Sequence, residues 1–513
     1  MERTADRKIN ILSAVIALLA ISATFVTDKR MFVFPASSDE RYNLALTDYT
    51  VCKIIAFFVL FALLRLIFIL IMSKGEKRRD LIEVLKCAAL YLPVVLVCLA
   101  IKLPGGYVTN DEYSILSDAT NLVHDTWFNY MTVYFYIISL MLIPVKYGPI
   151  FMKALIELFI VGYCVFRSRG YFGRKAGLFM YALFLLYPVI AYTTSAHRLP
   201  VYFLVYLALF CKLTFDRLEK KDITLSGAAF ILLSGAVLTQ WRTEGIYLLA
   251  LIPILMLLVY PKLRNVRMAA LVIIAYASIQ FVISIPQNGM GGDLSGAAND
   301  RMKPFYAYTI TNMFRNGLDT DKNAEDLAIV DRYLALSQIE KINEHYGDIN
   351  YEDVLILYKE EFPAVREDAG YTEYYEFTEA LKRIFKNNPD VFAKTRIGAF
   401  RYAALPYHIT YSGASPKSLA ALAVSIVKSL AYNLFIPTAF AALMCIVCLV
   451  KRKWFGFFAA GGLIAHWSIV FVLAPASYFK YYFPVYIMSY FFITVLLIWY
   501  FAGKKRGLSC PVS

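Results

Sequence analysis

The main pattern in the sequence is a series of apolar runs, each about 20 residues long, separated by short polar turns. The hydrocarbon core of a bilayer is about 30 Å thick, so a helix needs about 20 apolar residues to span it. The first run follows a basic start, is long for a signal-peptide core and has no clear cleavage site, so we count it as a span. The pattern predicts an all-α polytopic membrane protein with spans at 9–26, 51–72, 82–101, 149–166, 176–193, 200–215, 224–240, 245–260, 268–285, 425–450, 454–474 and 482–501.

Composition supports this interpretation. Of the 513 residues, 59 % are hydrophobic and 18 % are charged, whereas soluble proteins have about 45–50 % apolar and about 25 % charged residues. An aromatic content of 16 % also excludes a disordered chain. The net charge of +14 is then a signal of membrane topology and not of nucleic-acid binding.

One further apolar run, 130–144, decides the topology. If it crosses the membrane, the basic cluster at 167–175 and later basic loops fall outside. If it does not cross, seven basic clusters with 23 Lys and Arg residues face the cytoplasm, and the short outer loops hold eight. Basic loops remain in the cytoplasm, so we predict a re-entrant or interfacial helix at 130–144, twelve spans and two cytoplasmic termini.

The polar segment 286–418 then lies outside. Positions 287–417 hold 20 acidic and 15 basic residues, while the rest of the chain holds 18 acidic and 37 basic residues. We expect a flexible stretch at 286–300, then helices, then an amphipathic piece at 389–407 that could lie on the membrane surface. None of the eight cysteines falls in this segment, so no disulfide framework holds it. Two apolar helix faces are predicted, one of Ile329, Tyr333, Leu336 and Ile339 and one of Tyr374, Phe377, Leu381 and Phe385.

The candidate chemistry lies in the short outer loops. Asp111 and Glu112 follow a Gly-rich turn, and such a carboxylate pair can act as a general base or hold a divalent cation. The simpler interpretation is that Asp111 caps the following helix. Three cations lie in tight outer turns, and each alone could reach the headgroups, but together they suit a phosphate group. These cations are Arg198, next to His197, Arg242, next to Glu244, and Lys480, between Tyr478 and Tyr481.

Charges inside the predicted spans are also candidates. Glu157 lies near the middle of span 149–166, and Lys428 lies near one end of span 425–450. Intramembrane charges are functional candidates by default, and we expect Glu157 to pair inside the bundle. His124, His345, His408 and His466 show no metal-ligand spacing.

Taken together, these motifs resemble the GT-C superfamily of membrane glycosyltransferases. The similarity covers about 82–285 and 450–501, with two additional spans in 1–81, an outer segment at 286–418 and C-terminal spans in 419–513. The family's acidic first outer loop is similar to TNDEYSILSDATNLV, and the aromatic helix that follows it is similar to YMTVYFYIISLMLIP. Its basic cytoplasmic turn is similar to FRSRGYFGRKAG, and its polar outer turn to TTSAHRLP. Its Arg-x-Glu-Gly turn is similar to LTQWRTEGIYLLA, and its final basic-aromatic-proline signature to SYFKYYFPVY.

The resemblance implies inverting transfer of a sugar from a polyprenyl-phosphate donor to a glycan, lipid or protein acceptor on the outer face of the plasma membrane. Asp111 would be the base and Glu112 would orient the site. Arg242 and Lys480, assisted by Arg198, would bind the donor phosphate, with supporting roles for Glu244, His197, Tyr478 and Tyr481. Many members carry an acidic residue where this chain has the turn 195–198, so a metal-independent mechanism is at least as consistent, and no cofactor is assigned.

Three alternatives remain open. A flippase or transporter of lipid-linked sugars would place charges at mid-membrane and break its helices. An envelope-polysaccharide polymerase or ligase of another fold would also have many spans and a large outer loop. A structural or receptor role would leave the acidic and basic residues of the outer loops unexplained.

Overall fold

The computed structural model of the chain describes residues 2–511 apart from 108–109, 124–128, 194–198, 290–293, 347–363, 367–369 and 406–418. Within these ranges the elements are helices, and the β-type contact is one isolated bridge between Leu334 and Val365. The chain forms two compact units. The first comprises Met1–Gly291, Leu443–Gly462 and Ile487–Ser513, and the second comprises Gly292–Ala442 and Leu463–Tyr486.

The prediction of an all-α multi-pass membrane protein is confirmed in its general form. Eight segments of the described chain are long and apolar enough to cross a bilayer, judged by length and composition. Predicted spans 176–193, 200–215, 224–240 and 245–260 are not among them. The eight are Asp6–Met31, Tyr42–Met72, Glu76–Lys102, Gly148–Phe172, Val266–Pro286, Ser425–Val450, Trp454–Leu473 and Phe479–Gly503.

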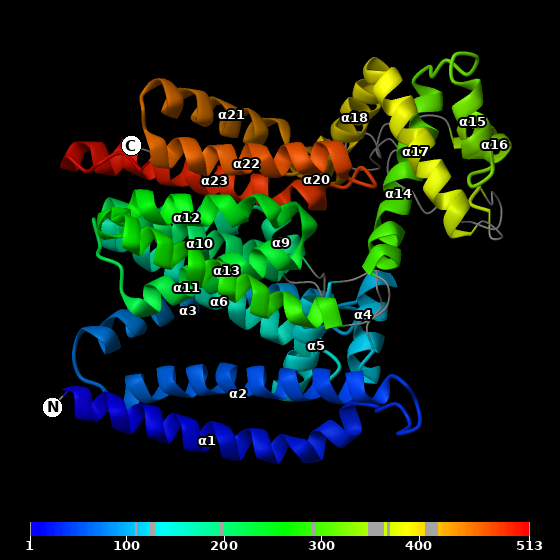
Figure 1. Ribbon diagram of the computed structural model, residues 1–513. Coiled ribbons are helices and arrows are strands. Elements are labelled where there is room, and N and C mark those ends of the chain that lie inside the picture. Colours follow the sequence, from blue (N-terminus) through cyan, green and yellow to red (C-terminus); the bar gives the residue numbers. More distant parts are fainter. Residues whose placement is uncertain are drawn as a thin grey trace. The chain divides into compact units, whose positions relative to one another are not determined.

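The first unit contains the helices up to residue 289 (Figure 1). They are α1 (Glu2–Met31), α2 (Tyr42–Met72), α3 (Glu76–Lys102), α4 (Asn110–Asn121), α5 (Tyr130–Leu142), α6 (Gly148–Phe172), α7 (Arg174–Gly177), η1 (Leu178–Met180), α8 (Tyr181–Phe184), α9 (Tyr187–Thr193), α10 (Pro200–Leu218), α11 (Leu225–Trp241), η2 (Thr243–Tyr247), α12 (Leu248–Val259), η3 (Pro261–Arg264) and α13 (Val266–Gly289).

Helix α6 is the central element of this unit, in contact with α3, α5 and α10. Its most extensive contact is with α3, where a Cβ on Gly162 would lie 2.6 Å from the carbonyl oxygen of Val84 and 3.0 Å from the Cβ of Ala88. Small residues at such positions let membrane helices pack closely. Helices α1 and α2 lie side by side along their lengths (Figure 1).

The predicted short helix within 130–144 is present as α5. Its 13 residues extend about 20 Å at 1.5 Å per residue, less than the bilayer core of about 30 Å. Asn129 begins the helix, with its side chain accepting a hydrogen bond from the Met131 backbone at 2.9 Å. Most of its side chains are buried against α2, α4, α6 and α11.

Two predicted spans are interrupted. Segment 176–193 consists of four short pieces, α7, η1, α8 and α9, and Pro188 lies at the start of the last of them, where a missing N–H is tolerated. Segment 425–450 is divided into α20 (Leu419–Ala431) and α21 (Phe435–Val450). The Asn433 side chain accepts hydrogen bonds from the backbone of Phe435 at 2.8 Å and Ile436 at 3.2 Å, which starts a new helix.

The C-terminal helices contribute to both units. They are α21, α22 (Trp454–Leu473), η6 (Phe479–Tyr482), α23 (Phe483–Ile498), the π-turn η7 (Trp499–Gly503) and η8 (Lys504–Arg506). The unit boundaries fall after Ala442, Gly462 and Tyr486, inside the three longer helices.

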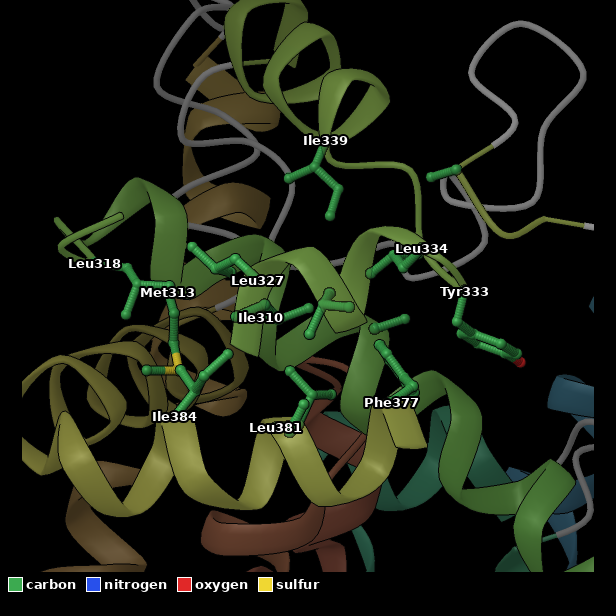
Figure 2. Packing of buried hydrophobic residues seen from close by; sticks show 14 of the residues in the cluster. Ile310, Met313, Leu318, Leu327, Tyr333, Leu334, Ile339, Phe377, Leu381 and Ile384 are labelled. Atoms are coloured by element: carbon green, nitrogen blue, oxygen red, sulfur yellow. The ribbon is translucent and has the colours of Figure 1, made fainter. Parts of the chain in front are cut away.

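The second unit confirms that the described part of 286–418 is mainly helical. Its elements are α14 (Leu294–Arg315), α15 (Ala324–Asp331), α16 (Leu336–Tyr346), α17 (Tyr371–Asn387) and α18 (Pro389–Ala404). Figure 2 shows their shared core, in which Ile310, Leu327 and Ile339 meet residues from α17. Residues of both predicted faces enter this core, Tyr333 and Ile339 from the first and Tyr374, Phe377 and Leu381 from the second. The first set does not form one helix face, because Ile329 lies in α15 and Ile339 lies in α16.

The structure describes helices at both ends of this segment. The stretch 286–300 forms the end of α13 and the start of α14, with 290–293 outside the described residues. Helix α18 buries part of its apolar face in this unit, where Phe400 packs on Phe435, Trp467 and Tyr482 with ring centroids 5.2–5.5 Å apart. Its position on the membrane surface stays a prediction. Arg396 of α18 is 1 % exposed and donates to the carbonyls of Phe471 at 2.6 Å and Ala474 at 2.9 Å.

Candidate functional site

The acidic pair begins helix α4, and its two members face different surroundings. Asp111 is partly exposed, whereas Glu112 is 1 % exposed. Glu112 shares the buried face of α4 with Ile115 and Ala119, both 0 % exposed, at the three- and four-residue spacing of one helix side. Both carboxylates lie in the first turn, where the helix dipole favours negative charge.

Two lysines interact electrostatically with Glu112. They are Lys102, in the last turn of α3, and Lys153, on α6. The Lys102 ammonium donates to the carbonyl of Ala191 at 2.6 Å, and Lys153 is 1 % exposed. A buried charge of either sign requires compensation, which the opposite charges here supply.

Glu157 belongs to the same group of charges. It lies one turn after Lys153 on α6 and is 0 % exposed. The Tyr91 hydroxyl is 3.3 Å from Glu157 Oε1 and donates to the Phe184 carbonyl at 2.8 Å. Glu157 also interacts electrostatically with Lys102 and Lys153. We name Lys102, Glu112, Lys153 and Glu157 the buried charge group.

The Gly-rich loop before α4 is held against α6. A Cβ on Gly106 would lie 2.4 Å from Cδ1 of Ile150, so this position has room only for glycine unless Ile150 moves. Tyr107 donates its hydroxyl to the carbonyl of Lys146 at 2.7 Å. Burial raises the pKa of Tyr107 well above its ordinary value, and the nearby negative charge of Glu112 raises it further. The Tyr107 hydroxyl is therefore a neutral donor beside the acidic pair.

The turn at 241–245 joins α11 to η2 and holds Arg242. Arg242 is in the extended conformation, and its side chain pairs with Glu244 through two contacts, Nε to Oε2 at 3.1 Å and Nη2 to Oε1. Both side chains are mostly buried, at 14 % and 17 % exposure. Gly245 is required by the close return of the chain, because a Cβ there would lie 2.5 Å from the carbonyl oxygen of Leu238. The pairing with Glu244 therefore holds the guanidinium of Arg242 in one position.

The same turn is attached to α5. Trp241 donates its indole N–H to the Thr132 hydroxyl at 3.0 Å, and Asn129 donates its side-chain amide to the carbonyl of Gln240 at 2.7 Å. Helix α5 also packs on α4. Helix α4, which carries the acidic pair, and the turn that carries Arg242 therefore both contact α5.

The remaining predicted site residues lie elsewhere. His197 and Arg198 fall outside the described residues. Lys480 belongs to the second unit, where its ammonium lies over the rings of Tyr478 at 4.8 Å and Tyr481 at 5.9 Å. In the same unit the carbonyl of Tyr481 is 3.0 Å from Nε2 of the buried His466. These contacts fix the η6 turn that carries Lys480.

Lys153 is not among the site residues predicted from the sequence. Its signal is present in the sequence, since a lysine stands four residues before Glu157 inside an apolar run. Opposite charges at this spacing lie on one helix face. Lys102, one of the eight basic residues of the predicted outer loops, reaches a backbone carbonyl of α9.

Comparisons do not add a relative, because no family model, characterised protein or solved structure matches this chain. Within the described residues, no group of three or more His, Cys, Asp or Glu side chains is placed to hold a metal ion. The chemistry must therefore be argued from the side chains above.

Proposed function

We propose that this chain is an inverting membrane glycosyltransferase of the GT-C type, which transfers a sugar from a polyprenyl-phosphate donor to an acceptor at the outer face. The observation that carries the proposal is the division of the acidic pair. Asp111 is partly exposed and accessible to an acceptor, while Glu112 is buried beside Lys102 and Lys153. One acid is thus available for proton transfer and the other is anchored.

The reaction is a single displacement at the anomeric carbon. Asp111 takes the proton of the acceptor hydroxyl, whose oxygen forms the new bond to the anomeric carbon. The bond from that carbon to the phosphate oxygen breaks, and polyprenyl phosphate leaves with the electron pair. Cations neutralise the developing negative charge. We propose Arg242, which pairs with Glu244, for this role, with Lys480 and Arg198 assisting.

The proposal includes the topology expected from the charges. We propose twelve membrane crossings, with the shorter helices α10, α11 and α12 among them, and both termini in the cytoplasm. The support is the excess of basic residues in one set of loops. An introduced cysteine at position 147 checks this, because labelling only from the cytoplasmic side would contradict the assignment.

The activity test requires the donor to be identified first. Mass spectrometry of lipid-linked sugars in cells that lack the protein shows which donor accumulates. Turnover is then measured with the purified chain in lipid nanodiscs. Asp111→Asn should lower kcat by about 100-fold or more, the usual contribution of a general base. The matched control is Asp118→Asn, a carboxylate change two turns further along α4. Normal turnover by Asp111→Asn would remove this residue from the mechanism.

A second candidate is favoured by one observation. Lys153 and Glu157 are both fully buried inside the segment Gly148–Phe172, where a transporter would carry coupled charges. A flippase for lipid-linked sugars would lose transport across proteoliposomes in Glu157→Gln while producing no glycosylated acceptor at any stage. A glycosyltransferase would form product with donor and acceptor supplied on the same side of the membrane.

A further inference from the structure

The hairpin of α1 and α2 has polar attachments to the helices that carry the candidate site. Asp48 on α2 is 2 % exposed, and its Oδ1 accepts a hydrogen bond from the Tyr134 hydroxyl of α5 at 2.5 Å. Tyr134 is 4 % exposed and packs edge-on against Tyr130, with centroids 5.0 Å apart. A buried hydrogen bond to a carboxylate is among the stronger kinds.

Helix α5 connects α2 to the turn that carries Arg242. Thr132 and Tyr134 are two residues apart, about 200° around the helix, so they project from nearly opposite sides. Tyr134 meets α2, and Thr132 accepts from Trp241, the residue before Arg242. Helix α5 therefore lies between α2 and the end of α11, with hydrogen bonds to both (Figure 1).

The hairpin also touches the helix of the acidic pair. The backbone N–H of Val33, just after α1, donates to the carbonyl of Thr120 in the last turn of α4 at 2.8 Å. Inside the hairpin, Asp28 pairs with Lys53 and accepts from Tyr49 at 2.7 Å, which fixes α1 against α2. One rigid hairpin is thus bonded to α4 and α5.

We infer that the α1–α2 hairpin is a positioning element of the site and that Tyr134 and Asp48 are positioning residues for the Arg242 turn. The sequence suggested that residues 1–81 are an addition before the catalytic module. The contacts instead make this hairpin part of the support for Arg242. The effect on sugar transfer rests on the proposed function, whereas the effect on the turn itself does not.

The test measures the mobility of the turn directly. A nitroxide is attached at Thr243→Cys, an exposed position of the turn, in the full chain in nanodiscs. The same label at Ser226→Cys, exposed at the far end of α11, is the control. The signal from the native cysteines is subtracted with the unsubstituted chain. Tyr134→Phe, which keeps the ring, and Asp48→Leu should mobilise the label at 243 and leave the label at 226 unchanged. Asp48→Asn retains an acceptor oxygen and should behave like the parent.

The kinetic measurement separates this inference from the proposed function. In the glycosyltransferase assay, Tyr134→Phe should lower kcat/KM for the donor by about 10-fold, with KM for the acceptor unchanged, because small misplacements of a positioned group are costly. An immobile label at 243 in both Tyr134→Phe and Asp48→Leu would overturn the inference. A mobilised label in a chain that transfers no sugar from any accumulated lipid donor would overturn the proposed function and retain the inference.

Discussion

Gly162 and Gly170 allow the same substitution to be compared at two positions of α6. At Gly162 an added Cβ would lie 2.6 Å from the carbonyl oxygen of Val84 and 3.0 Å from the Cβ of Ala88, so α3 and α6 must separate. Non-bonded carbon atoms pack at about 3.5–4.0 Å, so the required movement is about 1 Å. At Gly170 a Cβ would meet nothing within 4 Å.

The two substitutions are expected to have opposite signs. Alanine is favoured over glycine in a helix by about 0.5–1 kcal/mol, and Gly170→Ala should gain this amount. Gly162→Ala gains the same but suffers overpacking of about 1–3 kcal/mol. The movement also stretches the contact between Tyr91 and Glu157, already 3.3 Å long, and loss of a hydrogen bond to a buried charged group costs about 1.5–3 kcal/mol. The net effect of Gly162→Ala is a destabilisation of about 1.5–5.5 kcal/mol.

Reversible unfolding in mixed micelles measures both free energies under one condition. The comparison is internal, because both variants change the same helix by the same methyl group. If Gly162→Ala is as stable as Gly170→Ala, the close backbone contact of α3 and α6 does not exist in the protein. A lower stability of Gly170→Ala would refute the argument that its surroundings are open.

Three further predictions concern other parts of the chain. Lys53→Met should destabilise the first unit by about 3–5 kcal/mol because it leaves the buried Asp28 carboxylate uncompensated, and the double variant with Asp28→Asn should recover most of the loss in the same unfolding assay. Gly245→Ala should displace the Arg242 turn and lower kcat/KM for the donor by about 10–100-fold; unchanged donor kinetics would count against a role for this turn. Arg396→Met should lower the stability of the second unit by about 2–4 kcal/mol, measured by hydrogen exchange in α18, since two charged hydrogen bonds to backbone carbonyls are lost.

The general architecture could be predicted because helix formation in a membrane depends on local composition. Apolar runs of sufficient length and the 3.6-residue period of α17 are visible in the sequence itself, and the described structure has the corresponding helices. The break at Asn433 was missed although its signals were present. An asparagine that can cap a helix is followed four residues later by Pro437, which is typical of a helix start.

The site could be predicted only as a set of residue types. Sequence spacing placed Asp111 and Glu112 in one loop, but which of them is buried depends on the rotation of α4 against its neighbours, and that rotation is set by tertiary packing. The partners of Glu112 come from α3 and α6, and no local pattern connects them. Lys153 was passed over because a single lysine does not change the apolar character of the run that contains it.

Buried polar contacts have a particular importance in a chain of this kind. Lipid is as apolar as a leucine surface, so apolar contact alone does not strongly fix the rotation or register of one membrane helix on another. A pair such as Arg167 and Asp216, at 2.9 Å and both at most 5 % exposed, is satisfied in only a narrow range of helix positions. The hydrogen bond between Tyr134 and Asp48 imposes the same restriction on α5 and α2. The geometry of the Arg242 turn should therefore respond to polar substitutions at Tyr134 and Asp48, far from it in the sequence, and not only to changes within the turn itself.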